Sequence, residues 1–182
     1  MLIATHNVNG IRAAERRGFT GWRAARGCAV IGLQEVRCPI DRLPLDVFGD
    51  YHVAYDPGVL AGRNGVALLT REPVAAIRSW GSQAVSWAPQ ATPTPVAGND
   101  ATGLTRKLRQ FGAEGRYIEV DLTDLPLTVA SVYIPKGDTP YAPRGAEPDP
   151  AAVARYNRKM AFLSGFARQL GRARRAALAR VR

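Results

Sequence analysis

The sequence predicts an α/β (α+β) fold in which short strands form mixed, sandwiched sheets, and three observations point to it. Seven strand-like runs, each bounded by Gly, Pro, Asp or Asn, fall within 182 residues. Some runs are continuously apolar, as strands buried on both faces are, whereas others alternate between apolar and polar residues. Residues 11–27, between the first two runs, carry apolar side chains at loosely helical spacing. The length suits one core, so we expect residues 1–182 to form a single domain.

The strand-like runs differ in the faces that they bury. In RYIEVDL, Tyr117, Glu119 and Asp121 share one face, and the apolar residues between them share the other. CAVIGLQ and GVALLT are apolar on both faces. The runs are LIATHNV (2–8), CAVIGLQ (28–34), YHVAY (51–55), GVALLT (65–70), PVAAIR (73–78), RYIEVDL (116–122) and LTVASVYI (127–134).

Polar side chains follow the first two runs directly. Asn7 and Asn9 stand in THNVNG, where Asn and Gly suit a turn because they tolerate left-handed backbone angles. Glu35 follows the second run, where a carboxylate is either an ordinary strand-end residue or a ligand. If a helix over 11–27 connects two parallel strands, Asn7 and Glu35 lie at neighbouring carboxyl ends, where open sheets place their ligands. The sequence therefore predicts that these two side chains meet.

Two segments lie outside the strand pattern. Residues 79–113 have little periodicity and many Pro, Thr, Gly and Ala residues, so we expect a surface insertion, disordered in part. Its Trp80 and Trp87 either stack on nucleic-acid bases or fill a local core. Residues 150–180 are expected to form a basic helix, because Asp149 is a suitable N-cap and apolar residues then recur at three- and four-residue steps.

Composition excludes several classes of protein. The formal net charge is +10, but residues 152–182 hold nine Lys and Arg and no acidic residue, so the excess belongs to one segment. No apolar run approaches the roughly 20 residues that cross a membrane, and no secretory signal pattern is present. Cys28 and Cys38 have neither zinc-site spacing nor the context of a disulfide. We expect a cytoplasmic protein with no membrane partner.

Six blocks of sequence, taken in order, carry a resemblance to a known family. They resemble the exonuclease III family of apurinic/apyrimidinic endonucleases, in the endonuclease/exonuclease/phosphatase superfamily, over most of residues 1–78 and 114–175. The blocks are THNVNGIRA (5–13), VIGLQEVR (30–37), RNGVALLTREPV (63–74), EGRYIEVDL (114–122), LTVASVYIPKG (127–137) and RYNRKMAFL (155–163). The resemblance implies a four-layer α/β/β/α sandwich with mixed sheets, of which this chain is the N-terminal two-thirds.

The same resemblance implies an activity. It is Mg²⁺-dependent (or Mn²⁺-dependent) hydrolysis of DNA phosphodiesters by a DNA-repair nuclease, which acts as a monomer on double-stranded DNA with abasic sites or 3′ ends.

The resemblance also implies roles for individual residues. Asn7 and Glu35 match the family's metal ligands, and Tyr133 in YIPKG matches the tyrosine that faces the scissile phosphate. Arg116 in EGR matches an arginine that contacts the DNA backbone. Asn9 and Lys159 match positions beside the site.

Departures from the family pattern concern mainly the C-terminal part. The family's later Gly-Asp-x-Asn motif and Ser-Asp-His ending have no counterpart here, and the histidines are His6 and His52. We therefore expect a truncated chain, incomplete as a domain, that cleaves little or nothing alone and exposes strand edges meant for further strands. Two alternatives remain open: a non-catalytic nucleic-acid-binding module that uses the basic helix 150–180, and a superfamily phosphatase.

Overall fold

The computed structural model describes residues 1–60, 62–98, 101–142 and 146–180, and the side chains among them up to residue 175. The chain divides into two compact units. Unit 1 comprises Met1–Ala101 and Gly112–Tyr133, and unit 2 comprises Thr102–Phe111 and Ile134–Arg182. This division into compact units does not test the single domain expected over residues 1–182, which stays a prediction. The ending ALARVR (177–182), taken as a sign of truncation, lies outside the described side chains.

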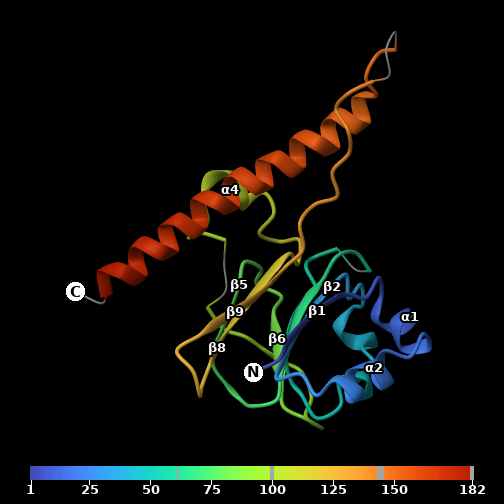
Figure 1. The fold of residues 1–182 in the computed structure, drawn as a ribbon, viewed down its shortest axis with the longest axis vertical. Coiled ribbons are helices and arrows are strands. Elements are labelled where there is room, and N and C mark those ends of the chain that lie inside the picture. Colours follow the sequence, from blue (N-terminus) through green and yellow to red (C-terminus); the bar gives the residue numbers. More distant parts are fainter. Residues whose placement is uncertain (61, 99–100, 143–145, 181–182) are drawn as a thin grey trace. The chain divides into compact units, whose positions relative to one another are not determined.

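Unit 1 contains a six-stranded mixed sheet in the order β1-β2-β4-β3-β6-β7 (Figure 1). Strands β1 and β2 are parallel, with Asn7 opposite Gln34, and the remaining pairs are antiparallel. The strands are β1 (Ile3–Asn7), β2 (Val30–Gln34), β3 (His52–Asp56), β4 (Val66–Thr70), β6 (Val85–Trp87) and β7 (Thr94–Pro95).

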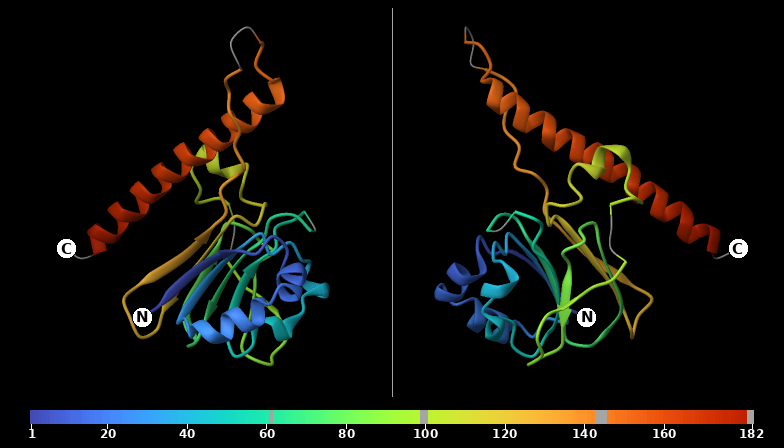
Figure 2. Two further views of the ribbon diagram at one scale, coloured as in Figure 1. Left: turned by 45° about the vertical axis from the view of Figure 1, so that its right-hand side comes forward. Right: turned by 180° about the vertical axis from the view of Figure 1, so that it is seen from behind.

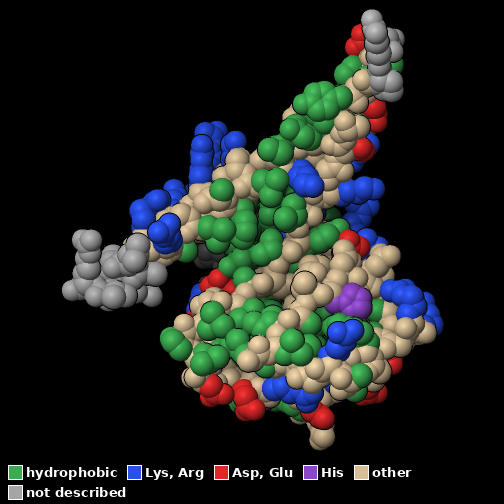
Figure 3. Space-filling view, viewed as in Figure 1, with side chains coloured by type: hydrophobic (Ala, Val, Ile, Leu, Met, Phe, Trp, Pro, Cys, Tyr) green, Lys and Arg blue, Asp and Glu red, His purple; other side chains and the backbone are tan. Residues whose placement is uncertain are grey.

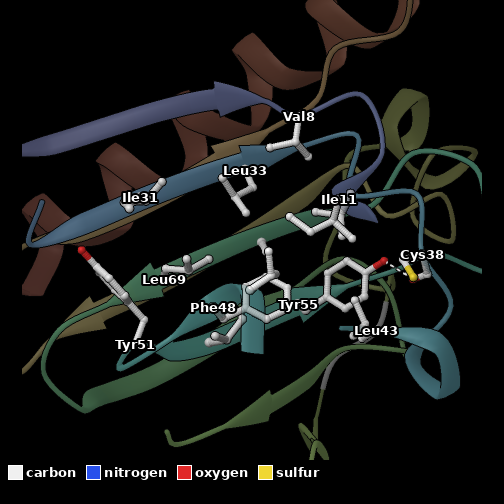
Figure 4. Close-up of a cluster of buried hydrophobic side chains, with 14 of the residues drawn as sticks. Val8, Ile11, Ile31, Leu33, Cys38, Leu43, Phe48, Tyr51, Tyr55 and Leu69 are labelled. Carbon is white, nitrogen blue, oxygen red and sulfur yellow. Dashed lines mark hydrogen bonds between the residues drawn. The ribbon is translucent and has the colours of Figure 1, made fainter. Parts of the chain in front are cut away.

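Short helices cover one face of this sheet (Figure 2). They are α1 (Ile11–Arg16), α2 (Phe19–Arg26) and the 3₁₀ turns η1 (Ile40–Arg42) and η2 (Leu45–Phe48). Their apolar side chains pack on the sheet in one buried cluster, which includes Ile11, Phe48 and Tyr55 (Figure 4). The Tyr55 hydroxyl donates a hydrogen bond to the Cys38 carbonyl inside the cluster. The phenol is thus buried without an unpaired polar group, which would otherwise cost free energy.

A three-stranded antiparallel sheet covers the other face. Its order is β5-β8-β9, with β5 at Val74–Ser79, β8 at Tyr117–Leu122 and β9 at Thr128–Val132. Ile118 and Val120 of β8 pack against the six-stranded sheet in a second buried cluster. Because β2 and β4 lie between the helices and this sheet, they are buried on both faces, which explains their continuous apolar runs. The predicted α/β fold with mixed, sandwiched sheets is confirmed.

Both sheets of unit 1 end in strands that pair on one side in the described part of the chain. Among them, β1 pairs only with β2, and β9 pairs only with β8. Leu2 and Ile3 at the β1 edge are 54% and 44% exposed, and Leu127 before β9 is 40% exposed. Apolar residues beside an unpaired edge are the pattern expected where further strands would pair.

Segment 79–113, expected as a surface insertion, instead contributes in part to the core. Its strand β6 joins the six-stranded sheet beside β3. Trp80 stacks on Tyr117 with ring centroids 4.6 Å apart, and Trp87 packs edge-on against Phe48. Both indoles are buried, so they fill a local core and do not present a face to nucleic-acid bases. The apolar residues of this segment are spaced irregularly, so the sequence pattern did not predict strand β6. Positions 99–100 of the segment lie outside the described residues.

Unit 2 is built on α4 (Pro150–Arg180) and the short helix α3 (Arg106–Arg109). Asp149 accepts hydrogen bonds from the backbone N–H groups of Ala151 and Ala152, as expected for its N-cap position. Phe111, just after α3, packs edge-on against Phe162 of α4. The second part of segment 79–113 is therefore folded against the basic helix. Among the helices of the described residues, none combines the length and apolar character that a membrane crossing requires.

An ion pair on the outer face of the smaller sheet makes stability depend on pH. Arg78 forms a bidentate pair with Asp121, at 2.6 and 2.8 Å. The hydrogen bonds from Arg78 and then Thr128 lower the pKa of Asp121 from 3.8 to about 2. Because the folded-state pKa is depressed, the stabilisation is present above pH about 4 and is lost as the pH falls through about 2.

We expect Asp121→Asn to reduce the free energy of unfolding at pH 7 by about 1 kcal/mol or less, since the pair is partly exposed. Urea unfolding of wild type and variant between pH 7 and pH 2 measures this difference. The two proteins should converge toward pH 2, and a constant difference over that range would show that Asp121 does not act through its charge.

Candidate functional site

The candidate site forms where β1 and β2 end side by side. Asn7 is the last residue of β1, and Glu35 directly follows β2. Backbone hydrogen bonds continue between the two segments that follow these strands. The Gly10 N–H, for example, donates to the Glu35 carbonyl at 2.7 Å. Asn9 and Glu35 have positive φ angles of 46° and 55°, which are uncommon for residues with a side chain. Such strained positions cluster at functional sites, and both side chains here belong to the predicted set.

The two predicted metal ligands are in direct contact. The Asn7 amide Nδ2 donates to Glu35 Oε1 at 2.8 Å, and the Tyr133 hydroxyl hydrogen-bonds with the same carboxylate. Arg37 forms an ion pair with Glu35 Oε2. The Glu35 side chain is 13% exposed. The structure thus brings Asn7, Glu35 and Tyr133 together although residue 133 is far away in sequence.

Tyr133 is held in place by Arg116. It follows β9, and its backbone N–H donates to the Arg116 carbonyl at 2.8 Å. The Arg116 guanidinium donates back to the Tyr133 carbonyl at 3.1 Å and lies 5.0 Å from the centre of the Tyr133 ring. Glu114 accepts a further hydrogen bond from Arg116 at 2.5 Å. Arg116 therefore fixes the backbone and ring of Tyr133.

The surroundings of Arg116 differ from what its expected role requires. Its side chain is only 7% exposed and is already paired with Glu114. A guanidinium that grips a DNA phosphate would need to face the surface. In this structure Arg116 is a positioning residue for Tyr133, and its contact with DNA stays a prediction.

Two shifted pKa values describe the charge state of the site. Burial raises the pKa of Glu35, but hydrogen bonds from Asn7 and Tyr133 and the nearby Arg37 charge outweigh it, so the pKa is lowered overall. Burial and the adjacent Glu35 carboxylate raise the pKa of Tyr133. At neutral pH the site therefore holds an anionic carboxylate beside a neutral phenol.

Asn9 and Arg37 complete the rim of the site. The Asn9 backbone N–H donates to Asn7 Oδ1 at 3.1 Å, and Arg37 donates to Asn9 Oδ1 at 2.7 Å. Sequence reasoning did not single out Arg37, although it stands in the quoted block VIGLQEVR. It also passed over Arg12 and Arg16, which line a hollow of about 330 Å³ next to Arg37. The sequence did offer a signal, because these three arginines stand within or just after two of the blocks that resemble the family.

Lys159 belongs to the other unit. It lies on α4, and its side chain passes so close to Gly137 that a Cβ there would lie 2.5 Å from Lys159 Cδ. Both residues are part of unit 2. The proximity of Lys159 to the site of unit 1 stays a prediction.

The donor set is compatible with one hard cation that keeps most of its water. Within the described residues, no three His, Cys, Asp or Glu side chains gather as a metal cluster. Mg²⁺, however, commonly binds proteins through one or two carboxylates and several waters. Glu35 supplies one anionic carboxylate and Asn7 one amide oxygen, so these residues fit such an ion.

Comparisons with known proteins agree with this geometry. The sequence profile described as the Endonuclease/Exonuclease/phosphatase family matches residues 4–177. An AP endonuclease from Archaeoglobus fulgidus superimposes with a TM-score of 0.61 at 23% identity, over 93% of this chain and 51% of that chain. The APE2 catalytic domain from Xenopus laevis gives 0.56 at 24%, over 89% and 50%. The 3′ phosphatase NExo from Neisseria, bound to a product DNA hairpin, gives 0.59 at 17%, over 92% and 50%.

These structural likenesses concern the fold, because the identities are low. The chain spans about half the length of these solved structures. No curated protein sequence matches the chain.

Proposed function

The chain belongs to the endonuclease/exonuclease/phosphatase family, and from this premise we propose that it supplies the N-terminal part of a DNA phosphodiesterase of the exonuclease III type. The proposed substrate is double-stranded DNA with abasic sites or 3′ ends, and the proposed cofactor is Mg²⁺ or Mn²⁺. The observation that carries the proposal is the convergence of Asn7 and Tyr133 on the Glu35 carboxylate. The AP endonuclease and 3′ phosphatase among its structural neighbours support the choice of substrate.

Each side chain has a proposed task in this reaction. Glu35 and Asn7 would hold the cation, which when bound neutralises charge on the phosphate oxygens. Tyr133, a neutral phenol at neutral pH, would hydrogen-bond a phosphate oxygen, and Arg116 keeps its ring in position. The cations of Arg12, Arg16 and Arg37 would attract the sugar-phosphate backbone without reading bases.

We propose that the 182-residue chain alone cleaves DNA slowly or not at all. Members of a catalytic unit act together, and losing part of the unit commonly costs orders of magnitude in rate. The described residues offer one carboxylate at the site and no histidine hydrogen-bonded to it. The remaining groups would come from the half of the fold that the longer structural neighbours contain.

Joining the chain to the C-terminal half of the Archaeoglobus fulgidus AP endonuclease tests the proposal. We expect the joined protein, once a single cooperative unfolding transition shows that it is folded, to nick a 5′-labelled abasic duplex with Mg²⁺ and not with EDTA. A folded joined protein without Mg²⁺-dependent nicking would contradict the proposal. Nicking by the isolated chain at the same rate would contradict the need for a second half.

The reaction products separate this proposal from the phosphatase alternative. An AP endonuclease cleaves the strand, whereas a phosphatase releases inorganic phosphate from a phosphomonoester. If the joined protein releases phosphate from a small phosphoester and leaves the abasic duplex intact, the phosphatase alternative replaces the nuclease.

A further inference from the structure

Unit 2 contains a concentration of positive charge that the proposed nuclease site does not use. The segment 102–111 has three cationic side chains and no acidic one, and α4 likewise has no acidic residue. Figure 3 shows Lys and Arg side chains gathered along α4. Like charges held close together repel one another, so such a surface is expected to have an anionic partner.

The two helices that carry these charges are packed firmly together. The Thr105 hydroxyl donates to the Gly165 carbonyl at 3.2 Å, and the Thr105 N–H donates to the Gln169 side chain at 3.0 Å. A Cβ at position 165 would lie 3.0 Å from Leu108 Cγ, which shows how closely α3 approaches α4. Leu108 is fully buried. The cationic side chains therefore project from a pre-organised support.

A hollow of about 400 Å³ opens between α3 and α4, lined by Thr105, Arg106, Lys107, Gln110 and Arg168. Lys107 donates to Ser164 at 3.2 Å, a neutral partner. In the described part of the chain, no ion pair joins Arg106, Lys107 or Arg168 to a carboxylate. Three cations and no acidic or apolar side chain line the hollow, so its charge favours the binding of an anion.

Further cations extend the hollow along the helix. Arg172 and Arg175 follow Arg168 at steps of four and three residues and therefore lie on the same side of α4. Four residues of α-helix rise by about 6 Å, so the stripe presents charges in a line. A linear array of cations suits a linear polyanion better than a single small anion.

We propose that the hollow and this stripe bind the phosphate backbone of double-stranded DNA, without metal and without sequence preference. Guanidinium groups match phosphate geometry, and neutralised phosphates release counterions that favour binding. A membrane surface is the poorer match, because binding to it needs apolar side chains to enter the lipid, and the hollow has none. The proposed binding site uses none of the residues that surround Glu35, so it stands or fails independently of the proposed nuclease.

The test measures DNA binding by the full 182-residue chain in EDTA. A fluorescent intact 20-base-pair duplex, which has no abasic site, is titrated at several salt concentrations between 50 and 200 mM. The variant Arg106→Ala/Arg168→Ala is compared with a control variant, Arg26→Ala/Arg71→Ala, that removes the same charge from unit 1. Arg26 and Arg71 contact aromatic rings of unit 1 and lie outside the hollow.

We expect the Arg106/Arg168 variant to raise Kd about tenfold or more and to reduce the slope of log K against log salt by nearly two, since each phosphate contact contributes about 0.9. The control should change both values much less. Both replaced side chains of the hollow are exposed, so the helical circular dichroism signal and the thermal midpoint should be unchanged.

Three outcomes would overturn the proposal. Equal losses in the two variants would mean that only net charge matters. Binding to vesicles with 30% phosphatidylserine but not to the duplex would assign the hollow to a membrane. A rise in the thermal midpoint with 10 mM inorganic phosphate, together with unchanged duplex binding in the Arg106/Arg168 variant, would assign it to a free anion. Each leaves the Mg²⁺-dependent nicking test unaffected, so failure here differs from failure of the nuclease proposal.

Discussion

Replacing Glu35 by glutamine is expected to weaken divalent-metal binding at the candidate site strongly while leaving the fold intact. The substitution preserves shape but removes the negative charge that a hard cation needs. It also leaves Arg37 as a cation without its carboxylate partner, and this opposes a second positive charge nearby. We expect the affinity of the 182-residue chain for Mn²⁺ to fall by at least about tenfold, measured by electron paramagnetic resonance of free Mn²⁺.

The same substitution should affect cleavage more strongly than binding. In the joined protein, we expect Glu35→Gln to reduce nicking of the abasic duplex by roughly two orders of magnitude or more. Glu72→Gln is the matched control, since Glu72 is exposed and lies at the β4–β5 turn. The assignment of Glu35 as a ligand fails if the two variants bind Mn²⁺ equally well, or if nicking survives in Glu35→Gln.

Replacing Gly115 by alanine is expected to cause a large loss of stability. Gly115 has φ +63°, and a Cβ there would lie 2.6 Å from the Gly58 backbone nitrogen. The Asp56 carbonyl oxygen and the Pro57 carbonyl carbon would each lie 2.8 Å away. All three atoms are backbone, which cannot move aside as a flexible side chain can. The close approach is reinforced by the buried Asp56 carboxylate, which accepts a hydrogen bond from the Gly58 N–H at 2.9 Å.

We expect Gly115→Ala to reduce the free energy of unfolding by about 3 kcal/mol, measured by urea titration with far-ultraviolet circular dichroism. Gly27→Ala is the control, because Gly27 has a similar φ of +56° but nothing within 4 Å of its Cβ position. That variant should lose only about 1 kcal/mol from left-handed backbone strain. Equal losses in the two variants would show that the contact with Gly58 contributes nothing.

The Gly115→Ala substitution should also change the geometry of the candidate site. Gly115 directly precedes Arg116, whose guanidinium and carbonyl hold Tyr133. A shift of this turn would therefore move the phenol away from Glu35. The turn links the stability of unit 1 to the geometry of the site.

Much of unit 1 could be predicted from the sequence because its strands have strong patterns. Residues 28–34 and 65–70 were expected as buried strands, and the structure has β2 at Val30–Gln34 and β4 at Val66–Thr70. The meeting of Asn7 and Glu35 also followed, because parallel neighbouring strands end at the same sheet edge. The resemblance to exonuclease III relatives then linked residue 133 to that edge.

Other features depend on contacts that no local pattern encodes. Strand β6 pairs with β3, which lies about 30 residues earlier in the sequence. With three residues, Val85–Trp87, β6 is too short to show a pattern of alternating apolar and polar side chains. Arg116 looks like a surface cation in the sequence, yet folding buries it between Glu114 and Tyr133. The basic hollow likewise appears only when α3 and α4, some 60 residues apart, pack through Leu108.

The sequence by itself determined where seven of the strands and the basic helix lie, the family, and the pairing of residues 7 and 35. Periodicity, capping and chain order are local properties, and each can be read from neighbouring residues. Only the tertiary structure decided which cations are buried and which remain without a carboxylate partner. Burial and partner choice arise from segments distant in sequence, because desolvation and hydrogen bonding depend on every group that folding brings near.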